Sequence, residues 1–232
     1  MIVPYSGTRH ACRVYIQEAI KERIHAGEEN IFGDDCFEAS SYLAKFVWEA
    51  IADVIQAASS VMAYVKEIGE AYAEQNKYME WITPTGWLVL QQYNQTQKKR
   101  IKTHLSGEIL TLTYLQDKEN SVNKRRTGLG SSPNFIHSLD AAAMTKTINK
   151  ASGYGIKDYA MVHDSYGTHT TMMPLLSEIL REEFVKMYEE HDVLDELRTH
   201  AMNVLGTSDL PHPPTSGTLD LQRVLESPYF FA

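Results

Sequence analysis

The chain has 232 residues, 43% of them hydrophobic, and a net charge of −8, which is the composition of an ordinary globular protein. This length is enough for one sizeable hydrophobic core or two small ones. The N-terminus has no basic stretch followed by an apolar core, and Glu49, Asp53 and Lys66 interrupt the longest apolar segment, so we expect neither a secretory signal nor a membrane span. Cys12 and Cys36 are in no metal-binding spacing and fit free thiols in a reducing compartment.

The first third of the chain is predicted to be helical. Apolar spacing predicts a helix over residues 8–26, which Gly27 ends. A second helical segment is predicted from Asp35, a candidate N-cap, to about residue 76. Its wide apolar stripe is of the kind that usually forms core, and comprises Leu43, Phe46, Val47, Ala50, Ile51, Val54, Ile55, Ala58, Val61, Met62, Val65 and Ile68.

Two hairpins are predicted in the middle of the chain. The turn sequence Pro-Thr-Gly at residues 84–86 separates two strand-like runs within residues 78–93. Residues 101–115 contain a second strand-like pair with basic residues on its first arm, which predicts a projecting hairpin. The glycine-, serine- and proline-rich stretch at residues 128–133 is expected to interrupt the chain before a helix over 134–151.

The last third contains a third predicted hairpin. A short strand over residues 158–162 leads into residues 163–167 (His-Asp-Ser-Tyr-Gly), and residues 168–171 are expected to form the returning arm. Pro174 fits the first turn of a helix that extends to about Glu190. The remaining tail is predicted to be rich in loops.

Asp164 lies at the tip of this hairpin, after an apolar strand, where a rigid support exposes a carboxylate. Magnesium commonly uses one or two protein carboxylates, so Asp164 is a candidate Mg²⁺ ligand. The alternative is a turn in which Asp164 caps its own backbone. A Ser-His-Asp hydrolase is disfavoured, because the chain has no Gly-x-Ser-x-Gly segment and adjacent strand residues such as His163 and Asp164 point to opposite faces.

Two basic clusters lie in the middle of an otherwise acidic chain. One spans residues 98–102 (Lys-Lys-Arg-Ile-Lys) and the other residues 124–126 (Lys-Arg-Arg). DNA responds to local potential more than to net charge, so both are candidate phosphate contacts. The alternative for each is a solvated surface run.

Taken together, several segments resemble the single-subunit DNA-directed RNA polymerases of bacteriophage and mitochondrial type. Residues 163–167 are similar to the catalytic hairpin of that family, and residues 133–140 (Pro-Asn-Phe-Ile-His-Ser-Leu-Asp) and 81–86 (Trp-Ile-Thr-Pro-Thr-Gly) to two further family segments. The basic hairpin follows where the family has its promoter-specificity loop, and the aromatic C-terminus resembles the family's terminal foot. Ser165 occupies the position at which the related DNA polymerases normally have glutamate.

The resemblance implies an α+β fold: a mostly helical fingers portion with a partial polymerase palm and its catalytic β-hairpin, which together make an incomplete right-hand polymerase fold. Residues 1–92 would be the C-terminal part of the fingers, 93–123 the basic hairpin, and 124–232 the palm portion with the catalytic hairpin and the foot. The implied activity is DNA-dependent RNA synthesis from NTPs by two-metal phosphoryl transfer with Mg²⁺ as cofactor.

The resemblance also implies roles for single residues. Asp164 would be the catalytic metal ligand. Tyr5 would select ribose over deoxyribose through its hydroxyl, and His137 would contact the minor groove near the growing 3′ end. Asp140 and Asp158 match no metal-binding position of the family, so a surface or capping role is expected for both.

Further roles concern nucleic acid and support. The residues expected to contact the template or the promoter are His10, Arg13, Lys98, Arg100 and Lys102. The residues expected to support the active site are His163, Ser165, Gly167, Phe231 and Ala232.

Nothing in the chain matches the family's first catalytic aspartate or the Lys/Arg helix that holds the triphosphate. We therefore expect a polypeptide that supplies the N-terminal half as a partner, besides DNA template and promoter, RNA transcript and NTPs, and no membrane. The polymerase is either divided over two polypeptides, or Met1 is an internal methionine of a longer or disrupted reading frame. An inactive remnant, or a module that binds DNA or a partner, is the alternative function, and a family A DNA polymerase fragment is less favoured. The phage resemblance predicts the cytoplasm of a phage-infected bacterial host.

Overall fold

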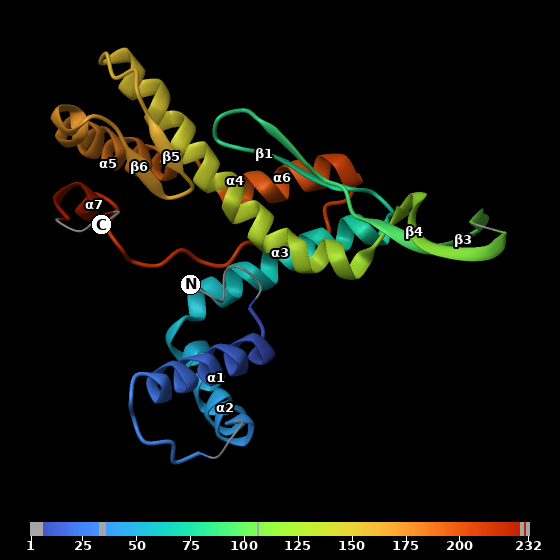
Figure 1. Ribbon diagram of the computed structural model, residues 1–232. Coiled ribbons are helices and arrows are strands. Elements are labelled where there is room, and N and C mark those ends of the chain that lie inside the picture. Colours follow the sequence, from blue (N-terminus) through green and yellow to red (C-terminus); the bar gives the residue numbers. More distant parts are fainter. Residues whose placement is uncertain (1–6, 33–35, 106, 228–229, 231–232) are drawn as a thin grey trace. The chain divides into compact units, whose positions relative to one another are not determined.

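The computed structural model describes residues 7–32, 36–105, 107–227 and 230 (Figure 1). The helices are α1 (Arg9–His25), α2 (Phe37–Val54), α3 (Gln56–Glu74), α4 (Lys124–Gly153), α5 (Met173–Glu190), α6 (Val193–Leu205) and α7 (Arg223–Glu226), with a 3₁₀ turn, η1 (Thr170–Met172). The strands are β1 (Met79–Ile82), β2 (Leu88–Gln91), β3 (Asn94–Leu105), β4 (Glu108–Val122), β5 (Ala160–Val162) and β6 (Ser165–Gly167). Within the described residues the strands form three separate two-stranded antiparallel sheets, so the fold class is α+β, as predicted.

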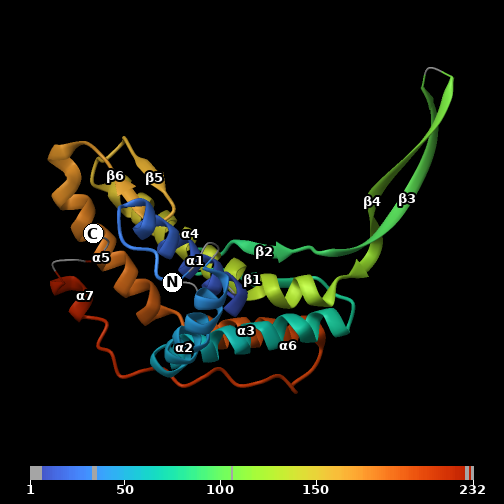
Figure 2. The ribbon, with the colours of Figure 1, turned by 60° about the horizontal axis from the view of Figure 1, so that its bottom comes forward.

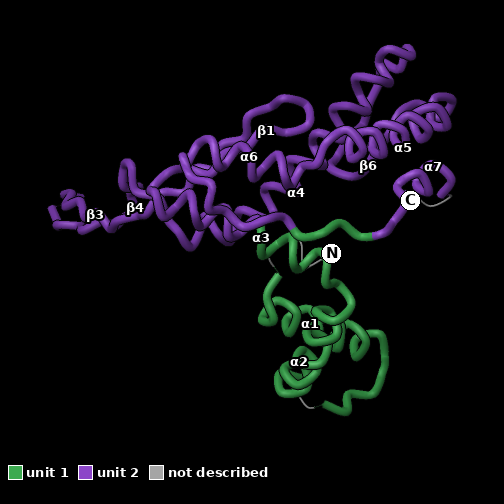
Figure 3. The backbone as a smooth tube through the Cα atoms, turned by 180° about the vertical axis from the view of Figure 1, so that it is seen from behind, with its two compact units in different colours: residues 1–64, 214–217 green, residues 65–213, 218–232 purple. Residues whose placement is uncertain are grey.

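The chain divides into two compact units (Figure 3). The first consists of residues 1–64 and 214–217, and the second of residues 65–213 and 218–232. This division falls within α3, whereas the boundaries implied by the polymerase resemblance follow residues 92 and 123. A division by spatial contacts does not test a division by function. The assignment of residues to fingers, basic hairpin and palm therefore remains a prediction.

In the first unit, α1 begins where the sequence predicts a helix. The Thr8 side chain caps α1 by accepting a hydrogen bond from the Ala11 backbone N–H at 3.2 Å. Cys12 on α1 and Cys36 just before α2 are buried, and neither is in a disulfide. Asp35, the expected cap of the second helical segment, lies outside the described residues.

The helical segment predicted to reach about residue 76 is two helices. The backbone leaves the helical conformation at Ile55 (φ −106°, ψ 57°), and α2 and α3 are bent by 89° at this break. Among the described residues, no single helix is long and apolar enough to cross a membrane, and α2 and α3 pass that test of length and composition only as a bent pair.

The apolar stripe of this segment is core only in its second half, which corrects the expectation. Val65 and Ile68 on α3 are 1% and 0% exposed. On α2, by contrast, Phe46 and Val54 are 49% and 82% exposed. Helical spacing tells which residues share a face, but it carries no information on whether another part of the chain covers that face.

The second unit is built around α4 and the β1–β2 sheet. Within the predicted turn, the Gly86 N–H donates to the Thr83 carbonyl oxygen at 2.8 Å, which confirms the strand–turn–strand prediction. Trp81 on β1 is buried, and its Nε1 donates to Ser138 Oγ on α4 at 2.9 Å. Its ring meets Phe135 of α4 edge-on at a centroid distance of 5.9 Å. The sheet is therefore fixed to the middle of α4.

Helix α4 is longer than predicted, because residues 128–133 lie inside it and do not interrupt the chain. Its glycines and small residues permit close packing. A Cβ on Gly130 would lie 2.7 Å from the Tyr93 ring, and a Cβ on Gly69 of α3 would collide with the Ser131 side chain. The helix continues through Pro133. Tertiary packing overrides the helix-breaking tendency of glycine and proline here.

Strands β3 and β4 form a long hairpin that projects from the second unit (Figure 2). The hairpin predicted around residues 101–115 is confirmed, and it is longer than that prediction. Its base is fixed to the end of α3: Asn76 Nδ2 donates to the Asn120 carbonyl oxygen at 2.7 Å, and Asn76 Oδ1 accepts from the Val122 N–H at 2.9 Å. Beyond this base nearly every side chain is exposed.

The C-terminal third departs from the prediction in two places. The returning arm of the third hairpin is β6, which comes directly after the turn and before the predicted residues 168–171. Helix α5 carries Pro174 in its first turn, as predicted. Helix α6 lies in the region predicted as loop. Asp192 caps α6 by accepting from the Asp195 N–H at 3.1 Å, and Gly206 ends it with φ 68°.

Candidate active site

The hairpin β5–β6 carries Asp164 on a two-residue turn. Val162 pairs with Ser165, so only His163 and Asp164 form the loop. His163 has φ 53°, in the left-handed region that few residues other than glycine adopt, although histidine does so more often than most. Asp164 is exposed. The left-handed backbone of His163 is thus part of the turn that carries Asp164, and the supporting role of His163 stays a prediction.

The β5–β6 hairpin packs against the hydrophobic core formed with α4 and α5. Met161 and Tyr166 form the central cross-strand pair, and both pack against a buried cluster from α4, α5 and the segment between α4 and β5. That cluster contains Ala151, Ile156, Leu176 and Ile179. Opposite Ala160, Gly167 has little room, since a Cβ on Gly167 would lie 3.1 Å from the Ala160 carbonyl oxygen. The short strands are thus packed tightly against each other and against the helices.

The two loop residues line two different cavities. Asp164 lines a cavity of about 350 Å³ together with α5, and His163 lines a cavity of about 360 Å³ together with His137 and Asp140 of α4. This separation agrees with the sequence argument against a hydrolase, because His163 and Asp164 face different spaces.

Asp140 is exposed, as expected for a surface carboxylate, and it also lines the cavity of His137 and His163. The pKa of Asp140 is raised above its usual value, mainly by partial burial. The Asp164 carboxylate raises it further, whereas His137 and His163 oppose the rise. Asp140 follows His137 by three residues, which places both on one helix face. That spacing was the signal for Asp140 in the sequence. Asp158 is also a surface residue, and it pairs with His169 at 3.4 Å.

Two tyrosines near Asp140 are kept protonated. Burial and the charges of Asp140 and Asp164 raise the pKa of Tyr166 on β6. Burial and the charge of Asp140 raise the pKa of Tyr188 on α5 to about 12. Both phenols are therefore neutral at physiological pH.

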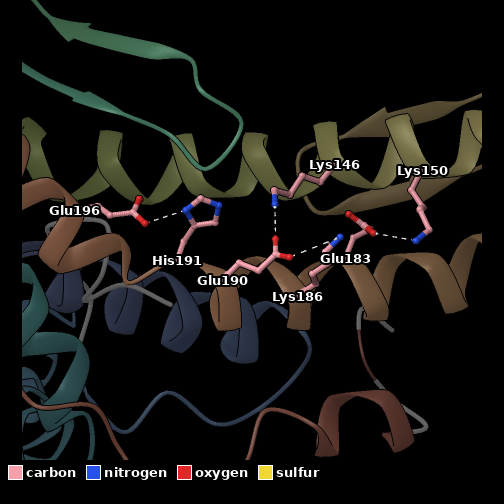
Figure 4. A network of polar contacts seen from close by, with 7 residues as sticks. All are labelled: Lys146, Lys150, Glu183, Lys186, Glu190, His191 and Glu196. Carbon is pink, nitrogen blue, oxygen red and sulfur yellow. Dashed lines mark hydrogen bonds and ion pairs between the residues drawn. The ribbon is translucent and has the colours of Figure 1, made fainter.

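Ion pairs fix the helices that support the hairpin (Figure 4). Between α4 and α5, Lys150 Nζ lies 3.6 Å from Glu183 Oε1, and Lys146 Nζ lies 3.6 Å from Glu190 Oε2. The Glu183 side chain is only 9% exposed, whereas that of Lys150 is 38% exposed. Lys186 pairs with Glu190 along α5 at 3.7 Å. The α4–α5 interface thus combines a buried carboxylate with cations that reach in from its edge.

The residues expected to bind the promoter lie on one face of the β3–β4 hairpin. Cross-strand pairing places Lys98, Arg100 and Lys102 on the same face, opposite Leu115, Thr113 and Thr111. His104 continues this basic face toward the tip. The other face carries the exposed apolar residues Ile101, Leu105, Leu110, Leu112 and Tyr114, together with Lys99 and Thr103. The pairing register therefore places three of the four basic residues of the 98–102 cluster on one face and most of the apolar residues on the other.

The remaining predicted site residues lie elsewhere. Arg13 and His10 belong to α1 in the first unit. The Arg13 guanidinium carbon lies 4.7 Å from the centre of the Phe37 ring, and Nη1 donates to Gln17 Oε1 at 2.9 Å, so packing accounts for its position. His10 is exposed. Three predicted site residues lie outside the described part of the chain: Tyr5, Phe231 and Ala232.

Comparison with known proteins places this site in a family. A model of the DNA-dependent RNA polymerase family matches residues 1–208. The chain is 37% identical over 227 residues to DNA-directed RNA polymerase 2, chloroplastic/mitochondrial, of Arabidopsis thaliana, which is 98% of the chain and 21% of that relative. It is 37% identical over 228 residues to DNA-directed RNA polymerase 2A of Nicotiana tabacum, covering 98% and 65%, and 35% identical over 227 residues to DNA-directed RNA polymerase 1, mitochondrial, of Nicotiana sylvestris, covering 98% and 22%. The chain thus spans about a fifth of the length of two of these relatives and less than two thirds of the third.

These relatives overturn one expectation. The cytoplasm of a phage-infected bacterium is wrong as a location, because the relatives are plant enzymes and two of the three are named as mitochondrial or chloroplastic. The motifs that carry the resemblance are common to phage and organellar polymerases, so they do not distinguish the two sources. The relatives are nucleotidyltransferases by name. With most of its length matched by the family model, the chain belongs to the DNA-dependent RNA polymerase family.

Proposed function

We propose that the chain is the C-terminal catalytic part of a DNA-dependent RNA polymerase, with Asp164 as a ligand of catalytic Mg²⁺. The observation that carries this proposal is the presentation of Asp164: an exposed carboxylate on a two-residue turn, backed by the α4–α5 core and next to a second carboxylate, Asp140. A rigid support of this kind suits a group that has to meet a metal ion in a defined position.

The donor set fits one ligand of a shared magnesium site. Magnesium prefers oxygen ligands and uses one or two protein carboxylates besides phosphate oxygens and water. The described residues contain no group of three or more His, Cys, Asp or Glu side chains that could hold a metal ion. Asp164 would therefore bind the ion together with ligands from outside this chain. When bound, Mg²⁺ would stabilise the charge that develops on the transferred phosphoryl group.

The cavity lined by His137, Asp140 and His163 is suited to the sugar and base edges of a nucleic acid. His137 offers ring nitrogens as hydrogen-bond partners from α4, and Asp140 lies one turn further along the same helix. In this proposal His137 contacts the minor groove near the RNA 3′ end. Asp140 holds the local potential negative, so that nucleic acid approaches through hydrogen bonds and the metal ion, not through direct phosphate contact.

The basic face of the β3–β4 hairpin provides a separate DNA contact. Lys98, Arg100 and Lys102 are spaced two residues apart on an exposed strand, so their charges line up along the hairpin. Such a row can follow a phosphate backbone or enter a groove. We propose that this face contacts the promoter.

Activity also requires residues that this chain does not provide. A single metal ligand and no triphosphate clamp cannot organise two metal ions and a nucleotide. We propose that a polypeptide with the N-terminal part of the polymerase, the completing polypeptide, supplies a further aspartate and the basic residues that hold the triphosphate. DNA template, NTPs and the RNA product are the other partners.

Asp164→Asn tests this function. In the chain combined with the completing polypeptide, the variant should lose RNA elongation by about a thousandfold, since a metal ligand contributes several kcal/mol to transition-state stabilisation and each 1.4 kcal/mol is tenfold in rate. Incorporation of labelled NTP measures elongation, and gel retardation measures DNA binding, which should stay unchanged. Asp158→Asn, at a surface carboxylate of the same region, is the control. Near-normal elongation by Asp164→Asn would exclude Asp164 from the metal site.

Tyr5→Phe tests the proposed role of Tyr5 in sugar selection. The substitution removes only a hydroxyl, and a polar group that meets the 2′-hydroxyl discriminates by what is left unpaired with a deoxyribonucleotide. The variant should incorporate dNTPs more readily at little cost in the rate with NTPs. Competition between NTP and dNTP at fixed concentrations gives the ratio, and an unchanged ratio would rule out this role.

A further inference from the structure

The cavity that contains Asp164 has one wall from the C-terminal end of the chain. Asp164, Ser165 and Tyr166 of the hairpin line it together with four residues of α5 and Phe230. The Phe230 ring rests edge-on against Phe184 of α5, with ring centroids 5.0 Å apart. An aromatic side chain near the end of the sequence thus stands beside the proposed metal ligand.

Arg181 on α5 holds this end of the chain. Its Nη1 donates to Ser177 Oγ at 2.5 Å, and its Nη2 donates to the Ser227 carbonyl oxygen at 2.8 Å. The guanidinium carbon also lies 5.9 Å from the centre of the Phe230 ring, within the range of a cation–π contact. Arg181 therefore contacts both the backbone of the C-terminal segment and the Phe230 ring, which lines the cavity.

The geometry of arginine makes this double contact possible. The guanidinium is planar and directs several N–H donors along fixed lines. Ser177 fixes one arm within α5, so the other arm is aimed at the C-terminal segment. Arg181 Nε is buried and meets no acceptor among the residues that the structure describes. A buried donor without a partner costs stability, so the stability of α5 alone does not explain this arrangement.

Resting on the polymerase function proposed above, we propose that Arg181 is a positioning residue for catalysis: it anchors residues 218–227 so that Phe230 stays in the wall of the Asp164 cavity. The wall restricts the positions that the Asp164 carboxylate and a bound group can take. Without the anchor the wall moves and kcat falls, because small misplacements of reacting groups are costly in rate. The KM for NTPs is retained, since the completing polypeptide supplies the triphosphate-binding residues.

Arg198 provides a matched control. This arginine of α6 also fixes a backbone segment, as its Nε donates to the Pro211 carbonyl oxygen at 3.0 Å and its Nη2 to that of Leu210 at 3.3 Å. It does not line the cavity of Asp164. Arg181→Ala and Arg198→Ala therefore remove the same kind of contact from two different segments.

The test uses both the chain alone and the completed polymerase. In hydrogen exchange on the chain, Arg181→Ala should speed the exchange of residues 218–227, and Arg198→Ala should speed that of residues 207–213 only. In the completed polymerase, Arg181→Ala and Phe230→Ala should each lower kcat by about 10- to 100-fold at unchanged KM. Their double variant should be no worse than the worse single variant. Arg198→Ala should keep kcat.

Each outcome supports or overturns a named part of the proposal. Unchanged exchange of residues 218–227 in Arg181→Ala overturns the anchor, whatever the activity. Additive losses in the double variant, or a loss in Arg198→Ala as large as in Arg181→Ala, overturn the positioning role. If the wild-type chain with the completing polypeptide makes no RNA, the proposed function fails, and the exchange measurement still decides the anchor by itself.

Discussion

Two antiparallel hairpins of the second unit, β5–β6 and β3–β4, are supported in opposite ways (Figures 1 and 2). The β5–β6 strands have three residues each, and their central pair packs on the α4–α5 core. The β3–β4 strands have 12 and 15 residues, and only the base of that hairpin is fixed, through Asn76. In sequence the 30 residues of α4 lie between the two hairpins, and the tip of β5–β6 shares a cavity with His137 and Asp140 in the middle of that helix.

In the proposed function, one backbone motif serves two kinds of contact. A metal ligand needs one side chain in one position, so the β5–β6 hairpin is short and tightly supported. A nucleic-acid contact needs a row of side chains along an extended partner, so the β3–β4 hairpin is long and exposed on both faces. The proposed catalysis and the proposed promoter contact thus depend on different physical properties, namely rigidity in one hairpin and charge alignment in the other.

The largest expected effect concerns the basic face. Replacing Lys98, Arg100 and Lys102 by alanine should weaken binding to a duplex DNA probe and reduce the slope of log affinity against log salt by about three, since each lost phosphate contact contributes about 0.9. Titration of the completed polymerase from low to physiological salt gives that slope.

Ile101→Ser with Leu112→Ser is the matched control on the other face of the same hairpin. This pair should leave the salt slope unchanged, because it removes no charge. Equal slopes for the wild type and the triple alanine variant would show that the basic row is a solvated surface. The contrast between a charge-aligned hairpin and a rigid one would then fail.

A smaller effect is expected at the support of β5–β6. Lys150→Ala leaves the buried Glu183 carboxylate without its cation and should lower the free energy of unfolding by about 1–2 kcal/mol, the lower part of the range for broken buried pairs because Lys150 is partly exposed. Lys186→Ala breaks an exposed pair along one helix and should cost at most about 0.5 kcal/mol. Urea unfolding measures both. Hydrogen exchange in Lys150→Ala should rise in β5–β6 and stay unchanged in β3–β4, and a uniform rise would contradict separate support.

The smallest effect concerns the turn. His163→Val places a β-branched residue at φ 53° and should destabilise the β5–β6 pairing by about 1–2 kcal/mol locally, whereas His163→Gly should keep the pairing, since glycine adopts this conformation freely. Amide exchange of β5 and β6 is the measurement. If valine and glycine have equal effects, the left-handed backbone at His163 does not control how the turn presents Asp164.

Local signals predicted the hairpins well. The Pro-Thr-Gly turn, the basic strand and the strand before Asp164 all appear where alternation and turn residues indicate them. Two further features could also have been predicted from local signals. Asp192 and Gly206 mark the ends of α6, and the His137–Asp140 spacing places both residues on one face of α4.

Other features depend on contacts that no local pattern encodes. Gly130 and Pro133 are typical of a helix end, yet α4 passes through both. At Gly130 the Tyr93 ring packs where a Cβ would lie, which accounts for the glycine. The α2 stripe is typical of core, yet Phe46 and Val54 are exposed. The two cavities at the β5–β6 turn arise from α4, α5 and the C-terminal segment together, so neither was predictable from residues 158–167 alone.

The pairing register of the β3–β4 hairpin has a consequence for how this sequence can diverge. Substitutions along its arms remove few buried contacts and should change stability by no more than about 0.5 kcal/mol, so the core places little constraint on them. Insertions are different, because side chains alternate between faces with a period of two. One added residue in β3 would turn Lys98 or its neighbours onto the other face, whereas two would restore the arrangement. Descendants of this sequence are therefore free to acquire new residues at the basic positions, while length changes in either arm should survive mainly in even numbers.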